Sequence, residues 1–123
     1  MNHTRHIGIF NAGTFSVTLV GAGGIGAMTA LVLAKMGVGR LIIYDEDKVD
    51  EFNLPVQFHK LSDVGKPKVI TIQRAIKEYA DEIAVEHRYS RVTKDTILEP
   101  THIVISAVDS IKSRKQIWCA VKH

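Results

Sequence analysis

The feature that most constrains this chain is a glycine cluster between an apolar run and a helical run. Gly21, Gly23 and Gly26 stand at the spacing G-x-G-x-x-G, after a β-branched segment and before a charge-free one. At this spacing the first glycine permits a tight turn off a strand, the second lets backbone approach a phosphate, and the third lets a helix lie close to the strand. The N-terminus of such a helix presents free N–H groups and the positive end of its dipole. The segment therefore predicts a strand, a phosphate-binding turn and a helix.

Strand and helix patterns alternate along the rest of the chain. We expect strands at about residues 15–20, 40–44, 83–88 and 102–106, and helices at about 24–36, from the segment 63–68 to about 79, and from about 110 to 121. Residues 94–99 are expected to form one helical turn, and residues 1–13 a short arm or edge strand. This alternation predicts an α/β fold: a Rossmann-like, mostly parallel sheet in the order three-two-one-four, with helices on both faces.

The composition is that of an ordinary globular domain, with 46% hydrophobic and 24% charged residues in a chain of 123. We expect residues 1–123 to form one nucleotide-binding domain. The charge-free stretch from Thr14 to Ala34 has the length of a membrane span, but its glycines favour a buried strand and helix. A net charge of +3 is too small and scattered to indicate nucleic acid. A single Cys119 and the absence of a cationic leader favour a cytoplasmic location.

Charged residues cluster where the predicted strands end, which is where open parallel sheets bind ligands. Asp45 ends the second strand, where a carboxylate can accept ribose hydroxyls, and Asp47 follows two residues later. Lys66 and Lys68 precede a helix, where an ammonium group can reach a phosphate. The alternative is that they are solvated surface lysines. Asp109 ends the fourth strand, where it can hold magnesium beside a polyphosphate or cap the last helix.

Five motifs in this order resemble the ThiF/MoeB family, whose larger relatives are the ubiquitin-activating enzymes. They are GAGGIG at 21–26, Tyr44–Val49, Asn53-Leu54 with Gln57, Asp63–Lys68, and Ser106–Asp109 with Arg114. The resemblance covers about residues 17–121. It implies an ATP-dependent adenylyltransferase, in which the terminal carboxylate of a ubiquitin-like or sulfur-carrier protein attacks the α-phosphate of ATP and pyrophosphate leaves.

The resemblance also implies roles for individual residues. It places Gly24 against the phosphates, Asp45 on the ribose and Asp109 on Mg²⁺, and it makes Lys68 and Asp109 the expected catalytic residues. The expected nucleotide-binding residues are Gly21, Gly23, Gly24, Gly26, Asp45, Asp47, Asn53, Gln57 and Lys66. ATP and Mg²⁺ are the implied cofactors, and no zinc site is expected within this chain.

The chain departs from the family pattern in two places. Val56 stands where the family has an arginine that is expected to contact the triphosphate. Replacing such a planar cation is not a conservative change. The chain also ends at His123 without the later strands, the paired zinc cysteines and the crossover loop of larger members. We therefore expect a truncated ThiF/MoeB-type domain that does not turn over alone. We expect it to form a homodimer, or to pair through strand 102–106 with a chain that supplies the rest of the sheet.

Two alternative functions remain open from the sequence. A non-catalytic nucleotide-binding or interaction module with the same fold would explain Val56 and the early end. An NAD-binding oxidoreductase domain would explain the glycine motif and Asp45, but it leaves the Asp63–Lys68 and Asn53-Leu54 segments without a role. ATP binding with a preference over NAD would separate the adenylyltransferase from the oxidoreductase.

Overall fold

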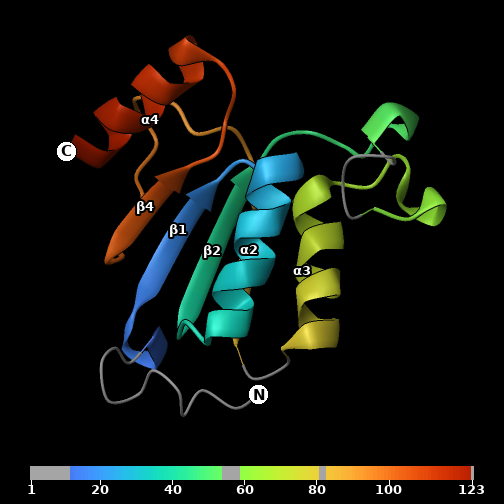
Figure 1. Ribbon diagram of the computed structural model, residues 1–123. Coiled ribbons are helices and arrows are strands. Elements are labelled where there is room, and N and C mark those ends of the chain that lie inside the picture. The colour runs from blue at the N-terminus through green and yellow to red at the C-terminus, as the bar shows by residue number, and fades with distance from the viewer. Residues whose placement is uncertain (1–11, 54–58, 81–82, 123) are drawn as a thin grey trace.

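A four-stranded parallel sheet organises the chain in the computed structural model (Figure 1). The structure describes residues 12–53, 59–80 and 83–122. The strands are β1 (Ser16–Val20), β2 (Arg40–Asp45), β3 (Ala84–Tyr89) and β4 (Ile103–Ser106). Their order across the sheet is β3-β2-β1-β4, which confirms the predicted order three-two-one-four.

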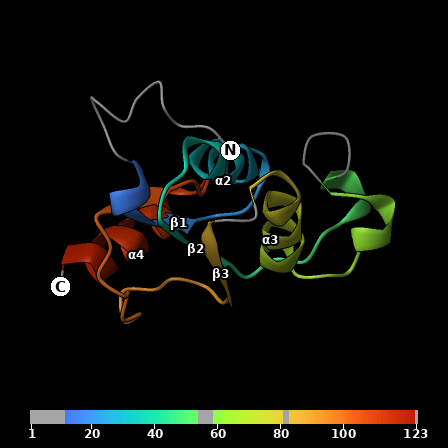
Figure 2. The ribbon, with the colours of Figure 1, turned by 90° about the horizontal axis from the view of Figure 1, so that it is seen from below.

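Helices cover both faces of this sheet, as the sequence predicts (Figures 1 and 2). Helices α2 (Gly24–Met36) and α3 (Lys68–Tyr79) pack on one face, and α4 (Ile111–Lys122) packs on the other. Because side chains alternate along a strand, Leu41 and Ile43 join the α2 and α3 core, whereas Ile42 and Tyr44 join the α4 core. The inner strand β2 is therefore buried on both faces, which explains the unbroken apolar run from Leu41 to Tyr44 between its charged ends.

Small residues let α2 lie close to the sheet. Ala27, Ala30 and Ala34 recur on one side of the helix and are each at most 2% exposed. The helix ends at Gly37, which adopts φ 83° and donates its N–H to the carbonyl of Ala34. Only glycine adopts this left-handed conformation without strain, so Gly37 rather than Gly39 is the cap.

Several predicted boundaries differ from the structure. Helix α3 begins at Lys68, because the preceding segment forms the 3-10 turn η3 (Leu61–Asp63) and then a bend at Gly65, where φ is 87°. No helix forms at residues 94–99. Instead, Thr93 accepts the N–H of Thr96 at its carbonyl in an isolated turn. The first described residues form a 3-10 turn, η1 (Ala12–Thr14), and the rest of the expected arm lies outside the described residues.

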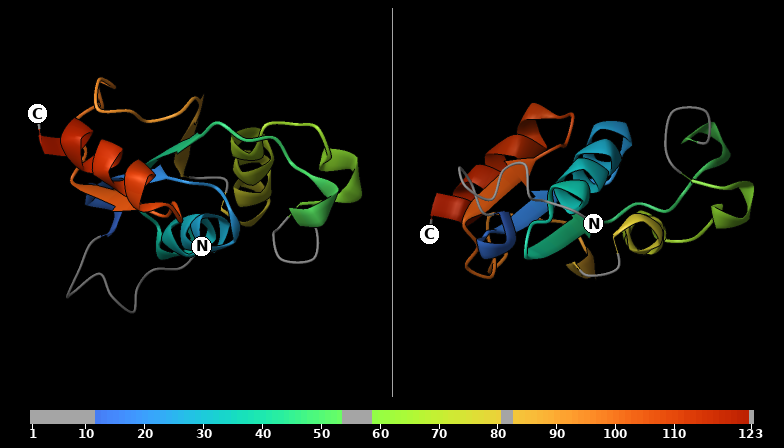
Figure 3. Two further views of the ribbon diagram at one scale, coloured as in Figure 1. Left: turned by 90° about the horizontal axis from the view of Figure 1, so that it is seen from above. Right: turned by 60° about the horizontal axis from the view of Figure 1, so that its bottom comes forward.

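The connection from β2 to α3 extends furthest from the sheet. Its two short turns, η2 (Glu51–Asn53) and η3, lie beyond α3 (Figure 3). The connection is nevertheless tied back to the start of α3, because Lys48 forms an antiparallel bridge with Pro67. Long connections in compact domains are commonly functional, and this one begins at the carboxyl end of β2.

Candidate functional site

The glycine turn is built by close backbone contacts at the carboxyl ends of β1 and β4. Gly21 has φ 111°, and its N–H donates to the carbonyl oxygen of Tyr44 at 2.8 Å. A Cβ on Gly21 would lie 2.8 Å from the carbonyl oxygen of Ala107. A Cβ on Gly26 would lie 1.9 Å from the carbonyl oxygen of Gly21. Both positions therefore require glycine, the first for its conformation and its contact, the second for its contact alone.

Asp45 fixes this turn to the end of β2. Its Oδ2 accepts the N–H of Ala22 at 2.7 Å, and its Oδ1 accepts the N–H of Asp47 at 2.7 Å. Hydrogen bonds from backbone N–H groups to a carboxylate are charge-assisted and are stronger than hydrogen bonds between neutral groups. The carboxylate thus has a structural task that the sequence motif does not reveal. Each oxygen retains a lone pair for a further donor, so ribose binding stays compatible with this geometry.

A cavity of about 440 Å³ opens in front of the glycine turn. Seven of the predicted site residues line it: Gly21, Gly23, Gly24, Asp45, Asp47, Lys68 and Asp109. They come from the ends of β1, β2 and β4, and from the beginnings of α2 and α3. The N-terminal N–H groups of α2 and one lysine thus meet three carboxylates in one cavity, an arrangement suited to a phosphate with a metal ion.

Lys68 is the cation of this cavity. It is the first residue of α3, it is only 7% exposed, and its backbone N–H donates to the carbonyl of Asp47 at 3.0 Å. Within the described part of the chain, no carboxylate lies within 4.0 Å of its ammonium group. A lysine held largely out of water without an ion-pair partner is well placed to bind an anion.

Four other predicted residues are not found in the cavity. Lys66 is exposed and lies in the turn before α3, where its backbone bonds to Val49 and Asp63. Gly26 packs α2 against the glycine turn, behind the cavity. Asn53 ends η2, but its side chain, like all of Gln57, lies outside the described residues. Val56, the departure from the family pattern, also lies outside them.

Asp109 does not cap helix α4, which leaves its carboxylate available to the cavity. The cap is Ser110, whose Oγ accepts the N–H of Ser113 at 3.0 Å and whose carbonyl accepts the N–H of Arg114. The side chain of Arg114 in turn donates from Nε to the carbonyl of Val108 at 3.1 Å. The capping alternative for Asp109 is thus wrong, because the hydroxyl one residue later takes that position.

A second, smaller cavity of about 70 Å³ adjoins the first on the α4 side of the sheet. The two share Gly21, Asp45 and Val108. The walls of the smaller cavity are largely apolar and include Tyr44 and Ile117, and its rim carries Glu46 and Arg91. Sequence reasoning missed this cavity, because its walls come from four strand ends and α4, which are far apart along the chain.

A buried polar cluster supports the connection that carries Lys68. Asp63 is fully buried, and its Oδ2 accepts both the N–H of Lys60 and Nη2 of Arg74 at 2.8 Å. Burial alone would raise the pKa of the Asp63 carboxyl, but the Lys60 N–H and the Arg74 guanidinium outweigh it, so the pKa is lowered. The carboxylate therefore stays charged and holds η3 to helix α3.

His59 belongs to the same cluster and has a structural role. It is 8% exposed, and its Nδ1 lies 2.9 Å from the hydroxyl of Thr71. That hydroxyl donates to the carbonyl of Lys68, so it accepts from the ring. Burial first, and then the charge of Lys68, lower the pKa of His59, which keeps the ring neutral at pH 7.

Two features are absent from residues 12–53, 59–80 and 83–122, a metal-binding cluster and a membrane-spanning helix. No group of three or more His, Cys, Asp or Glu side chains arranged to hold a metal occurs there. No helix there is long and apolar enough to cross a membrane. Magnesium beside a polyphosphate needs only one or two protein carboxylates, so the first finding leaves the Asp109 prediction open.

The chain is similar to known proteins in both sequence and structure. The ThiF family matches residues 8–123. The chain is 36% identical over 103 residues to adenylyltransferase and sulfurtransferase MOCS3 of Anopheles gambiae, covering 80% of this chain and 23% of that protein. It is 31% identical over 119 residues to ubiquitin-like modifier-activating enzyme 5 of Gallus gallus, covering 85% and 30%. The chain thus spans less than a third of the length of these two curated relatives.

A solved structure of E. coli MccB with ATP is 32% identical in sequence to this chain. The match has a TM-score of 0.64 and covers 66% of this chain and 25% of the MccB chain.

Proposed function

The chain belongs to the ThiF family, and from this premise we propose that it binds ATP with Mg²⁺ and forms the nucleotide site of an adenylyltransferase. In the proposed reaction a carboxylate oxygen of a ubiquitin-like or sulfur-carrier protein attacks the α-phosphorus of ATP. The bond from that phosphorus to the bridging oxygen breaks, and pyrophosphate leaves with the bonding electron pair. The products are an acyl-adenylate and pyrophosphate, so charge and atoms balance without another reactant.

The observation that carries this proposal is the shared cavity in front of the glycine turn. Gly24 begins α2, so its side of the cavity presents backbone N–H groups to an anion. Lys68, a largely buried residue, also lines this cavity and supplies its cation. The base would then extend into the smaller cavity, since the two share Gly21 and Asp45. MccB, the relative with a structure containing ATP, supports the same ligand.

Magnesium fits the Asp109 carboxylate of the cavity better than the Asp45 carboxylate. Both oxygens of Asp45 already accept backbone N–H groups, whereas the Asp109 carboxylate makes no hydrogen bond or ion pair to the described residues. Asp109 would therefore hold the ion together with phosphate oxygens. When bound, Mg²⁺ would neutralise part of the polyphosphate charge.

The protein's own groups would act by position and charge. The α2 N-terminus and Lys68 would hold the triphosphate and stabilise the negative charge that develops on the leaving pyrophosphate. Asp45 would keep the glycine turn in place while it accepts from the ribose. Effective concentration of the two reactants would supply much of the remaining acceleration.

Titration calorimetry with ATP and Mg²⁺ tests the proposal. We expect ATP to bind more tightly than NAD. Lys68→Ala should lower ATP affinity by roughly 10- to 100-fold, as expected for a charge-assisted contact. Lys77→Ala is the matched control, because Lys77 is exposed on the same helix and lines neither cavity. Tighter NAD binding, or equal losses in both variants, would contradict the proposal and favour the oxidoreductase alternative.

We further propose that the chain acts with a partner that completes its sheet, and that this takes place in the cytoplasm. Strand β4 lies at a sheet edge, where the described residues pair it only with β1, and Ile103 is 43% exposed. Such an edge offers unpaired N–H and C=O groups to another strand. Light scattering should detect self-association, unless a different chain fills that edge. With this chain and a ubiquitin-like carrier alone, pyrophosphate exchange should stay at background. Carrier-dependent exchange would show that the chain needs no partner, and it would also contradict the non-catalytic alternative.

A further inference from the structure

The rim of the smaller cavity carries one pair of opposite charges. Glu46 follows β2 and Arg91 follows β3, and an Arg91 Nη1 lies 4.0 Å from Oε1 of Glu46. Their side chains are 52% and 48% exposed, and both residues line the cavity. The described residues give neither side chain another ion pair. The pair therefore joins two strand ends across the rim without being fixed by other contacts.

The cavity beneath this pair has the chemistry of a site for a flat heteroaromatic ring. Val20, Tyr44, Val92 and Ile117 belong to the buried apolar cluster under α4 and also line the cavity. Apolar walls can contact the face of a ring, but they supply no charge to it. The planar cation at the rim is then the group that can bind the ring's π-system, because guanidinium groups stack on aromatic faces.

An exposed ion pair of this kind is easily opened. Water screens the two charges, and holding two long side chains in one geometry opposes the attraction. A ring that enters the cavity can therefore displace Arg91 slightly without breaking a buried network. Glu46 would still limit where the guanidinium moves, since both side chains stand at the ends of neighbouring strands.

We propose that Arg91 binds the base of the nucleotide by stacking its guanidinium over the ring, and that Glu46 is a positioning residue that holds Arg91 at the rim. This inference rests on the proposed ATP function and adds to it a residue that no family motif in the chain contains. Arg91 would contribute to the affinity for nucleotides but not to the affinity for a polyphosphate without a base.

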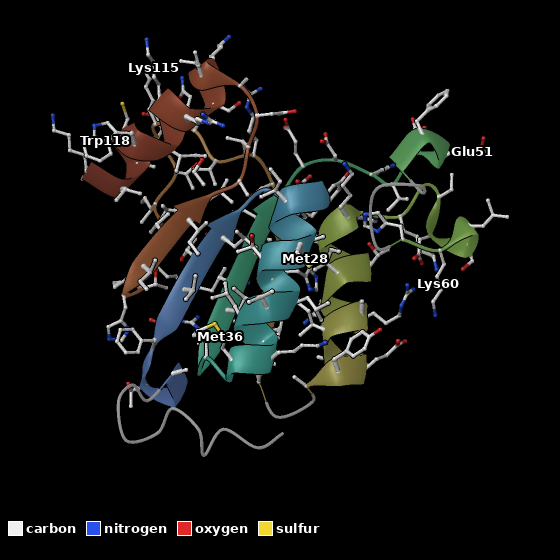
Figure 4. All side chains as sticks on the ribbon, in the orientation of Figure 1. Met28, Met36, Glu51, Lys60, Lys115 and Trp118 are labelled. Atoms are coloured by element: carbon white, nitrogen blue, oxygen red, sulfur yellow. The ribbon has the colours of Figure 1, made fainter. Side chains whose placement is uncertain are left out.

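Calorimetric titration of the full chain with ATP and with inorganic tripolyphosphate, each with Mg²⁺, separates these contributions. Arg91→Ala should lower ATP affinity about tenfold and leave tripolyphosphate affinity within about twofold. Arg91→Lys keeps the charge and removes the plane, so most of the loss should remain. Lys115→Ala is the control, because Lys115 is an exposed cation on the outer side of α4 that lines neither cavity (Figure 4).

The role of Glu46 is tested by a double-mutant cycle. Glu46→Gln should lower ATP affinity two- to threefold in the natural background and have no effect in the Arg91→Ala background, because it acts through Arg91. A further loss in that background would overturn the positioning role. Equal losses for ATP and tripolyphosphate, or no loss in Arg91→Ala, would overturn base stacking. Failure of the unmutated chain to bind ATP would instead refute the proposed function itself.

Discussion

Replacing Gly26 by alanine should destabilise the chain, although alanine is the better helix former. Gly26 lies within α2, where alanine would ordinarily add about 1 kcal/mol to the stability of an exposed helix. The added Cβ, however, would lie 1.9 Å from the carbonyl oxygen and 2.7 Å from the carbonyl carbon of Gly21. Both are backbone atoms of the glycine turn, so no side-chain rotation can relieve the contact.

The size of the effect follows from these two opposing terms. Overpacking of a well-packed site costs typically 1–3 kcal/mol, and a contact this short with backbone belongs at or above the upper end. After subtracting the gain in helix propensity, we expect Gly26→Ala to lower the free energy of unfolding by about 2 kcal/mol. Because α2 must shift away from the turn, the affinity for ATP should fall as well.

Urea denaturation followed by far-ultraviolet circular dichroism measures the change in stability. Val32→Ala is the control, because Val32 is 48% exposed on the same helix and its truncation leaves no cavity. This control should change stability by less than about 0.5 kcal/mol. A Gly26→Ala variant as stable as the natural chain, or more stable, would refute the reasoning, since helix propensity would then outweigh the contact.

Three further predictions concern other parts of the molecule. Asp63→Asn should lower the free energy of unfolding by about 2 kcal/mol at pH 7, because it removes the charge-assisted hydrogen bond between the buried carboxylate and the half-exposed Arg74. Because folding lowers the pKa of Asp63, the stability that its carboxylate contributes is fully present above the unfolded pKa of about 4 and is lost as the pH falls through the folded pKa. In urea denaturation, the difference in stability between the variant and the natural chain should therefore shrink below pH 4. A difference that stays constant with pH would contradict this origin. Glu99→Gln removes ion pairs to two arginines that join β2 and β3 to the segment before β4, so Tm should fall at low salt and less at 1 M salt, whereas a salt-independent change would point to packing. Val56→Arg should raise ATP affinity by up to about tenfold to a hundredfold in calorimetry, and no gain would mean that the family motif is not transferable to this segment.

The sequence alone was sufficient to predict the sheet and the edge at which the site forms. Apolar runs separated by helical patterns mark the strands, and the carboxyl ends of parallel strands meet at one edge. For that reason Asp45, at the end of one strand, and Asp109, three residues beyond another, could be predicted to lie near the glycine turn. The structure places both in one cavity with Lys68. These features depend on local periodicity and on the fixed geometry of parallel connections.

Only the tertiary structure determines the contacts between segments that are far apart in the sequence and share no local pattern. Asp45 holds the glycine turn through the N–H of Ala22, a bond between residues 23 positions apart. Asp63 is buried against Arg74, although a charged residue in a turn is usually predicted to be exposed. The rim of the smaller cavity carries Glu46 and Arg91, which become neighbours only because β2 and β3 pair in register. Side-chain partners of this kind depend on how loops close over the sheet, and loop closure is set by the whole fold rather than by the sequence near each residue.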